Sequence, residues 1–154
     1  MDNLDRAIIS LLHQDARIPS AEVARKLDQP ARTVQNRIQR LVDQGVIQPV
    51  AVINPASFGY TLVVDVSCEI EAGYLDQAIE KILQMPNVIY LAISTGDQDI
   101  NLQAVFRDSD EMHLFITHQL HQVVGMRRTR TVMLPRILKD SYQWLPPKES
   151  IELQ

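Results

Sequence analysis

The stretch SAEVARKLDQPARTVQNRIQRLV, residues 20–42, contains two short helical patterns around a tight turn. Ser20 is a good N-cap for the first helix, and Asp28-Gln29-Pro30 interrupts the pattern. Pro30 suits the first position of the second helix, which Gly45 ends. Two short helices joined in this way predict a helix-turn-helix. Each helix has apolar side chains at helical spacing: Val23, Ala24 and Leu27 in the first, and Val34, Ile38, Leu41 and Val42 in the second.

The second helix leaves one face free of large apolar side chains. Between Gln29 and Val42 the chain has three arginines and no acid. Arginine, amide and hydroxyl side chains form bidentate contacts with bases and bond phosphates, whereas a face that is merely solvated usually mixes Glu with Lys. We therefore predict that this face binds double-stranded DNA through Arg32, Thr33, Gln35, Asn36, Arg37, Gln39 and Arg40.

A longer helix precedes this pair, with Asp2 or Asn3 to cap its first turn. Its apolar positions are Leu4, Ala7, Ile8, Leu11 and Leu12. The three helices predict a tri-helical DNA-binding domain, which occupies residues 1–60 together with a β-rich linking strand, Val46–Ile53. Pro49 limits that strand to an edge or an irregular strand.

Composition and charge favour a cytoplasmic globular protein. Of the 154 residues, 45% are apolar, and no apolar run approaches the roughly 18 residues that a membrane helix needs. The first residues lack the basic start and apolar core of a signal peptide, and the single cysteine, Cys68, fits a reducing compartment. The net charge of −4 is uneven, because residues 1–60 carry seven basic and six acidic side chains and the acidic excess lies in residues 61–154.

From Leu62 the apolar period changes from helical to two, which indicates strands. The order β-α-β-β-α-β predicts a ferredoxin-like domain over residues 61–154, with both helices on one face, and hence an α+β protein. The second and last strands lie at the sheet edges in this fold and are rich in apolar residues, so we expect a second subunit to cover them. The expected elements are strands at 62–70, 88–95, 100–106 and about 128–138, and helices around 75–83 and 112–123.

The chain closely resembles the Lrp/AsnC family of feast/famine regulators, in order, from about Leu4 to Trp144. No single motif carries the resemblance, which rests on the ordered set. In the first half the matching pieces are Leu4-Asp5-Arg6, Asp15-Ala16-Arg17, Val23-Ala24, Val34 to Leu41, Gly45-Val46-Ile47, Ile53-Asn54-Pro55 and Phe58-Gly59. In the second half they are Thr95-Gly96-Asp97-Gln98-Asp99 and the run from Gly125 to Thr131.

The resemblance implies a sequence-specific transcriptional regulator modulated by a small effector such as an amino acid, bound between dimers. It also implies that the linking strand ties two subunits together and that homodimers assemble further, often to octamers. By sequence alone, Gly and Asp at 96–99 are simply turn formers. The resemblance instead makes them effector ligands with the start of the last strand, which gives Gly96, Asp97, Asp99, Thr129 and Thr131.

Two positions depart from the family pattern. Family members usually carry Gly, an apolar residue and Ser before the recognition helix, where this chain has Asp28, Gln29 and Pro30. We expect the Asp28 carboxylate to cap the turn instead. The position between the two acids of the Gly-Asp-x-Asp loop is often aromatic but is Gln98 here, so the effector of related proteins does not carry over.

Other functions find less support. A sirohaem-decarboxylase subunit has the same two-part architecture, but residues 126–145 lack the histidine and the Tyr-Asn pair expected at its active site, so we expect no enzyme. A sensor that has lost DNA binding conflicts with the polar face of the second helix. His118 and His121 lie three residues apart on a helix without a third or fourth ligand, so we expect no metal and no cofactor beyond an amino-acid effector.

Overall fold

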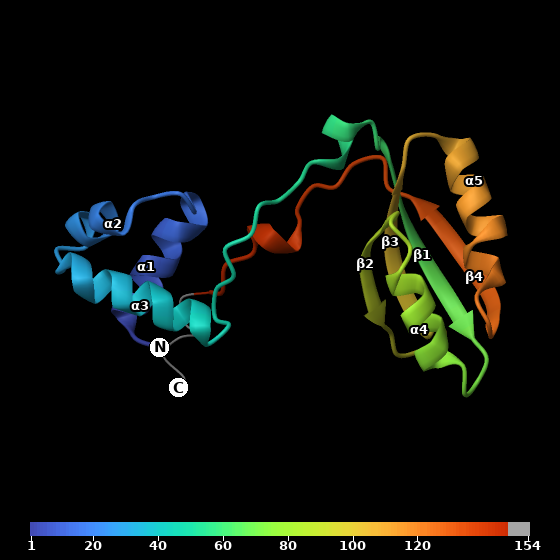
Figure 1. The fold of residues 1–154 in the computed structure, drawn as a ribbon, viewed down its shortest axis with the longest axis horizontal. Helices are drawn as coiled ribbons and strands as arrows, with labels where there is room; N and C mark the ends of the chain where they lie inside the picture. Colours follow the sequence, from blue (N-terminus) through green and yellow to red (C-terminus); the bar gives the residue numbers. More distant parts are fainter. Residues whose placement is uncertain (148–154) are drawn as a thin grey trace. The chain divides into compact units, whose positions relative to one another are not determined.

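The computed structural model describes residues 1–147 and divides into two units, each with its own core (Figure 1). The helical unit comprises residues 1–52 and 138–147, and the sheet unit comprises Ile53–Ile137. Tyr142 and Trp144 of the late segment line a hollow of about 520 Å³ with residues of the first and third helices. This division differs from the expected ranges 1–60 and 61–154, since the chain returns to the helical unit after its last strand.

The helical unit contains the three expected helices, α1 (Asn3–Gln14), α2 (Ser20–Lys26) and α3 (Ala31–Asp43). Their apolar stripes meet in one core, and the predicted helix-turn-helix is confirmed. A ring of partly buried apolar side chains surrounds this core. The fully buried members are Ile8, Val23, Ala24, Val34 and Leu41.

The helix starts differ from the prediction in which residue caps them. Asp2 caps α1 in a capping box with Asp5, as one of the two expected choices. The N-cap of α2 is Pro19 instead of the expected Ser20. The N-cap of α3 is Pro30, which was expected to be the first residue of that helix. Neither helix has a side-chain cap. Both prolines have φ near −60° with an extended ψ, which suits an N-cap that needs no N–H donor.

Asp28 does not cap α3, contrary to the expectation. It lies in the left-handed region, with φ 51°, and ends α2 instead. The backbone N–H of Gln29 donates to the carbonyl of Ala24 at 2.9 Å, which closes the helix C-terminus across Asp28. A left-handed conformation is ordinary for Gly and costs free energy for Asp.

The linking segment Val46–Ile53 forms no strand in the described chain, so the expected strand is absent here. The reason is physical: an extended segment becomes a strand only when a neighbouring strand accepts and donates its hydrogen bonds. Val50, Val52 and Ile53 are 57–68% exposed along it.

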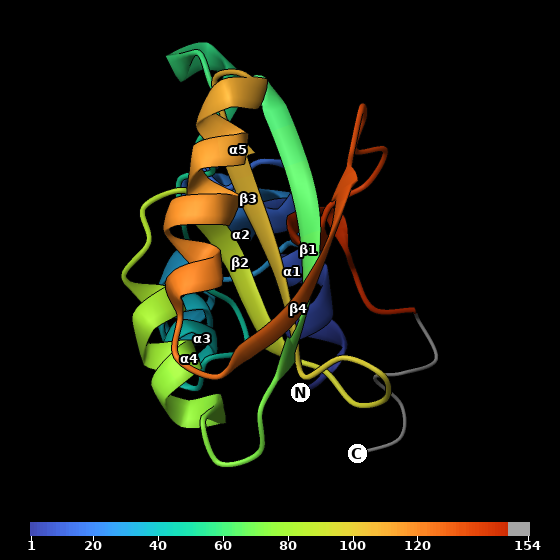
Figure 2. The same ribbon diagram turned by 90° about the vertical axis from the view of Figure 1, so that its right-hand side faces the viewer.

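The sheet unit has the predicted order β1 (Leu62–Ile70), α4 (Leu75–Leu83), β2 (Val88–Ile93), β3 (Ile100–Phe106), α5 (Ser109–His118) and β4 (Met126–Met133). Short 3₁₀ turns occur at Pro55–Phe58, Leu120–Gln122 and Ser141–Gln143. The sheet is antiparallel in the order β2-β3-β1-β4, with α4 and α5 on one side of it (Figure 2).

Three elements differ in their bounds from the predicted ones. β2 ends at Ile93 because the chain turns back after Ser94, whose N–H donates to the carbonyl of Asp99. β4 ends at Met133, one residue before a last bond from Leu134 N–H to Val63 and two before Pro135, which lacks an N–H. Helix α5 ends at His118, and a 3₁₀ turn at Leu120–Gln122 follows it.

The core of the sheet unit lies between the sheet and the two helices. Val64, Val66 and Cys68 alternate along β1 with no exposed surface, as the period of two predicts. Burial raises the pKa of the Cys68 thiol to about 12, so this cysteine is an inert core residue. Phe106 of β3 packs on Phe115 of α5 with ring centroids 5.1 Å apart.

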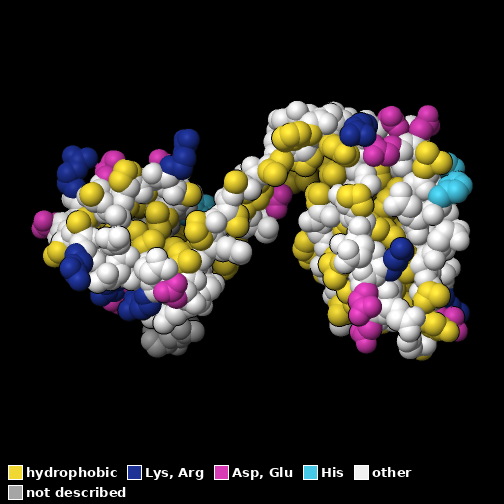
Figure 3. All heavy atoms as spheres, in the orientation of Figure 1, with side chains coloured by type: hydrophobic (Ala, Val, Ile, Leu, Met, Phe, Trp, Pro, Cys, Tyr) yellow, Lys and Arg dark blue, Asp and Glu magenta, His cyan; other side chains and the backbone are white. Residues whose placement is uncertain are grey.

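Both sheet edges carry exposed apolar side chains. Ile89, Tyr90 and Ile93 of β2 are 50–64% exposed, and Val132 and Met133 of β4 are 46% and 59% exposed. Figure 3 shows hydrophobic side chains in yellow on the β2 side of this unit. The prediction that these two strands are the edges is confirmed. Among the described residues, no helix has the length and apolar character needed to cross a bilayer.

Candidate nucleic-acid interface and effector loop

The solvent side of α3 is a row of polar side chains. Arg32, Gln35, Asn36 and Gln39 are exposed and follow one another at spacings of three, one and three residues, so they lie on one helical face. At the end of the row, Gln39 Nε2 donates to Oδ1 of Asp43 at 2.8 Å. Arg32 forms no ion pair with any other described residue, which leaves its charge available for a phosphate or a base.

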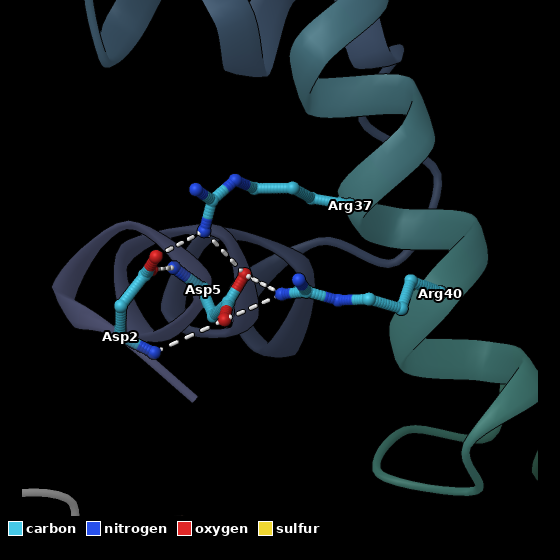
Figure 4. A network of polar contacts seen from close by, with 4 residues as sticks. All are labelled: Asp2, Asp5, Arg37 and Arg40. Carbon is cyan, nitrogen blue, oxygen red and sulfur yellow. Dashed lines mark hydrogen bonds and ion pairs between the residues drawn. The ribbon is translucent and has the colours of Figure 1, made fainter.

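Arg37 and Arg40 point instead toward the first turn of α1 (Figure 4). Arg37 Nη1 lies 2.9 Å from Oδ1 of Asp5 and also donates to Oδ2 of Asp2. Arg40 Nη2 lies 2.7 Å from both carboxylate oxygens of Asp5. The side chain of Asp5 is 1% exposed, whereas those of Arg37 and Arg40 are 25% and 47% exposed.

The sequence pattern placed both arginines on the same open face as Arg32, and the structure differs. At 100° per residue, positions 37 and 40 lie between the solvent face of α3 and its buried stripe. Their long side chains reach along that flank to the buried carboxylate. A buried ionised carboxylate without a cation would be costly, so Asp5 explains why two arginines stand there.

The charges in this cluster stabilise one another. Hydrogen bonding to Arg37 and to the N–H of Asp5 lowers the pKa of Asp2 to about 2. Burial raises the pKa of Asp5, but hydrogen bonds from the Asp2 N–H and from Arg37 outweigh it, and the net pKa is lowered. The same bonds raise the pKa of Arg37. Asp2, Asp5 and Arg37 therefore stay ionised at neutral pH, and the cluster holds α3 against α1.

Three of the predicted effector residues, Gly96, Asp97 and Asp99, lie at the turn between β2 and β3. Gly96 has φ 123° in the turn between β2 and β3, and Asp97 is exposed beside it. Oδ2 of Asp99 accepts the Ile70 N–H at 2.7 Å, so this carboxylate already has a structural partner. The Asp99 N–H also donates to the carbonyl of Cys68 at 2.9 Å, which fixes the end of β3 against β1.

The two threonines lie on the far side of β1 from this loop. Thr129 is opposite Cys68 and Thr131 is opposite Val66, both in β4. Since β1 separates β3 from β4, the backbones of Asp99 and Thr129 are about two strand spacings, or roughly 10 Å, apart. Nε2 of His121 lies 2.8 Å from Oγ1 of Thr129, a contact that sequence reasoning missed. The structure thus brings the loop residues together and leaves the threonines one strand away.

Sequence reasoning also missed two polar groups in the turn. Oγ of Ser94 and Oε1 of Gln98 are buried and have no hydrogen-bond partner. The available signal was Gln98 itself, a polar residue at a position that is often aromatic in the resembled family.

Regarding metals, residues 1–147 contain no group of three or more His, Cys, Asp or Glu side chains that could hold an ion.

An N-terminal helix-turn-helix unit followed by an α+β unit with a helix-covered antiparallel sheet defines a class of transcriptional regulators that pair a DNA-binding domain with a ligand-binding domain. Comparisons with known proteins agree with this class. Residues 1–48 match a model for winged helix-turn-helix DNA-binding domains, and residues 61–144 match the Lrp/AsnC ligand binding domain. The chain belongs to the Lrp/AsnC family and is a DNA-binding transcriptional regulator of that type.

Individual relatives cover nearly the whole chain. An uncharacterized HTH-type transcriptional regulator of Pyrococcus abyssi is 36% identical over 143 residues, 92% of this chain and 90% of the relative. Two solved structures, each 21% identical, show the same fold. Escherichia coli AsnC has a TM-score of 0.85 and covers 92% of this chain and 98% of its own. A Neisseria meningitidis regulator in complex with L-Met has a TM-score of 0.90, with 97% and 99% covered.

Proposed function

We propose that the exposed row of α3 is the DNA-contacting surface. Arg32, Thr33, Gln35, Asn36 and Gln39 face the major groove, where arginine and amide side chains discriminate bases by about 1–3 kcal/mol per good contact. The observation that carries the proposal is that this row is exposed, polar and free of acids as far as Asp43. Lys and Arg side chains also occur at several points around the helical unit, in dark blue in Figure 3.

Arg37 and Arg40 have a second role in this proposal. Their contacts with Asp5 set the position of α3 on α1, and Arg40, 47% exposed, also lies beside the passing phosphates. Holding α3 in position through the buried Asp5 and contacting DNA through exposed side chains are different contributions to DNA binding. Variants of the residues concerned separate the two. Arg32 is then the free contact, and Arg37 the positioning residue.

We propose a homodimer, with residues 1–60 as the DNA-binding domain and residues 61–154 as the domain that pairs subunits, with further assembly to an octamer. The exposed apolar side chains of β2 and β4 support this, because apolar edges left in water promote association. Two copies of α3 about 34–36 Å apart would meet successive major grooves on one side of the duplex. The extended, exposed segment Val46–Ile53 suits pairing with the same segment of a second subunit.

We propose that a free amino acid is the effector and that it binds at the β2–β3 turn, with Gly96, Asp97 and Asp99 as ligands and Thr129 and Thr131 as contributors. The Lrp/AsnC ligand-binding domain supports this, as does a structural neighbour whose complex contains L-Met. An effector that binds one assembly better than another shifts DNA affinity by a coupling free energy of typically about 1–3 kcal/mol. No metal or other cofactor is part of the proposal.

Fluorescence anisotropy with the duplex from upstream of the protein's own coding sequence tests the DNA proposal. The logarithm of the affinity should fall linearly with the logarithm of salt concentration, because phosphate contacts release counterions. Arg32→Ala should weaken binding about tenfold with an unchanged melting temperature. Arg136→Ala, an exposed arginine of the sheet unit, is the matched control and should bind as the wild type does. Equal affinities for all three proteins would refute the assignment of α3.

A further inference from the structure

The turn between β2 and β3 contains two buried polar atoms without hydrogen-bond partners. Among the described residues, three buried side-chain oxygens lack a hydrogen bond: Oδ1 of Asp65, Oγ of Ser94 and Oε1 of Gln98. Two of the three fall within five residues of one turn. Buried polar groups without partners destabilise a protein, so these two oxygens in the proposed effector loop call for an explanation.

The hairpin between β2 and β3 determines the positions of Ser94 and Gln98. Ile93 pairs with Ile100, and the Ser94 N–H donates to the carbonyl of Asp99 at 2.9 Å, which makes Ser94 and Asp99 the last rung. The chain reverses through Gly96, whose φ of 123° is disfavoured for other residues. Ser94 and Gln98 therefore lie on the two sides of the same turn, each one or two residues from Gly96 or Asp97.

The two acids of the loop, Asp97 and Asp99, differ in the partners that they contact. Oδ2 of Asp99 is occupied by the Ile70 N–H at 2.7 Å, so it holds the turn against β1. Asp97 is exposed and suits the ammonium group that every free amino acid carries. An ammonium contact does not distinguish one amino acid from another. Selectivity must come from groups that meet the effector's side chain.

Resting on the proposed effector function, we infer that Ser94 and Gln98 select the effector's side chain and that this side chain donates hydrogen bonds. Oε1 of Gln98 can only accept, and the Ser94 hydroxyl can accept as well as donate, so the two oxygens match an amide, hydroxyl or ammonium side chain and leave an aliphatic or thioether side chain without compensation. The effector class is therefore a polar amino acid with N–H or O–H donors, and Gln98 is the specificity-determining residue.

Isothermal titration of the full-length protein tests this with two sets of amino acids: glutamine, asparagine, serine and lysine against leucine and methionine. We expect at least one of the first set to bind about tenfold or more tightly than both of the second, as one satisfied buried hydrogen bond would give. Gln98→Leu should lower the affinity for that ligand about tenfold and remove the preference. Ser94→Ala should act in the same direction. Gln84→Leu, the same change at an exposed position of the sheet unit, should alter neither.

The melting temperature without ligand provides a second readout. Gln98→Leu should raise it relative to Gln84→Leu, because the substitution removes a buried oxygen that has no partner. Tighter binding of leucine or methionine by the wild type, or a preference that survives in Gln98→Leu, would overturn the inference and leave effector binding intact. Failure of every amino acid to bind would overturn the proposed effector function and this inference with it, while DNA binding would stand.

Discussion

Nη2 of Arg40 lies 2.7 Å from both carboxylate oxygens of Asp5, a residue 35 positions earlier whose side chain is 1% exposed. The contact ties the recognition helix to the first turn of the leading helix. Arg37 completes it from one turn earlier on α3. The orientation of the exposed row of α3 thus depends on a buried carboxylate of α1.

Removing the carboxylate should destabilise the helical unit. Asp5→Ala leaves Arg37 and Arg40 without their shared partner, and we expect a loss of about 1–3 kcal/mol, below the usual cost of breaking a fully buried pair because both arginines are partly exposed. Urea unfolding followed by circular dichroism measures it. Asp15→Asn is the control, since its pair with Arg17 is exposed and 3.9 Å long. A loss below about 0.5 kcal/mol in Asp5→Ala would show that the cluster does not hold α3.

The same cluster predicts a particular response to acid. The pKa of Asp2 is about 2 in the folded protein against 3.8 for the free side chain, so the unfolded chain binds more protons between these values. The stabilisation from Asp2 is complete above about pH 4 and is lost as the pH falls toward 2. The lowered pKa of Asp5 acts in the same direction.

Thermal melts at pH 5, 4, 3 and 2.5 check this. The melting temperature of the wild type should fall more steeply below pH 4 than that of Asp2→Asn, which has no proton to take up at this position. At pH 5 the wild type should be the more stable of the two. Parallel curves for the two proteins would contradict the assigned contacts.

The turn before the recognition helix offers a stabilising substitution. Asp28 has φ 51°, a conformation that costs an L-residue about 1–2 kcal/mol, less for Asp, and costs Gly little. Asp28→Gly should raise the free energy of unfolding by about 0.5–1 kcal/mol. Asp28→Ala, which keeps the Cβ in the same conformation, should give no gain. Equal stabilities in urea for the Gly and Ala variants would mean that the backbone relaxes at this position.

Sequence patterns predicted the elements of this fold because burial follows their periods. Val34 and Leu41 repeat at helical spacing and are buried in α3, and Val64 and Val66 alternate along β1 and are buried against the helices. The edge positions of β2 and β4 followed from the element order. These features depend on neighbours close in the sequence or on a topology with few alternatives.

The features that the sequence did not predict depend on long-range partners. A polar residue on a helix is expected to face solvent, so Arg37 and Arg40 gave no sign of carboxylates more than 30 positions away. The usable signal was Asp5, an acid between the apolar positions 4 and 8 of α1. Val46–Ile53 has strand composition but forms no strand in one chain, because a strand requires a partner. The unpartnered oxygens of Ser94 and Gln98 depend on how the folded turn packs, which no local sequence pattern encodes.

The most direct test of the account compares affinities for the upstream duplex and for a shuffled duplex of equal length at one salt concentration. In the double variant Arg32→Ala/Asn36→Ala, we expect the ratio of the two affinities to fall at least about tenfold while the melting temperature and the shuffled-duplex affinity change little. Arg136→Ala should keep the wild-type ratio. A double variant that folds and retains the wild-type ratio would contradict the claim that the exposed row of α3 recognises DNA.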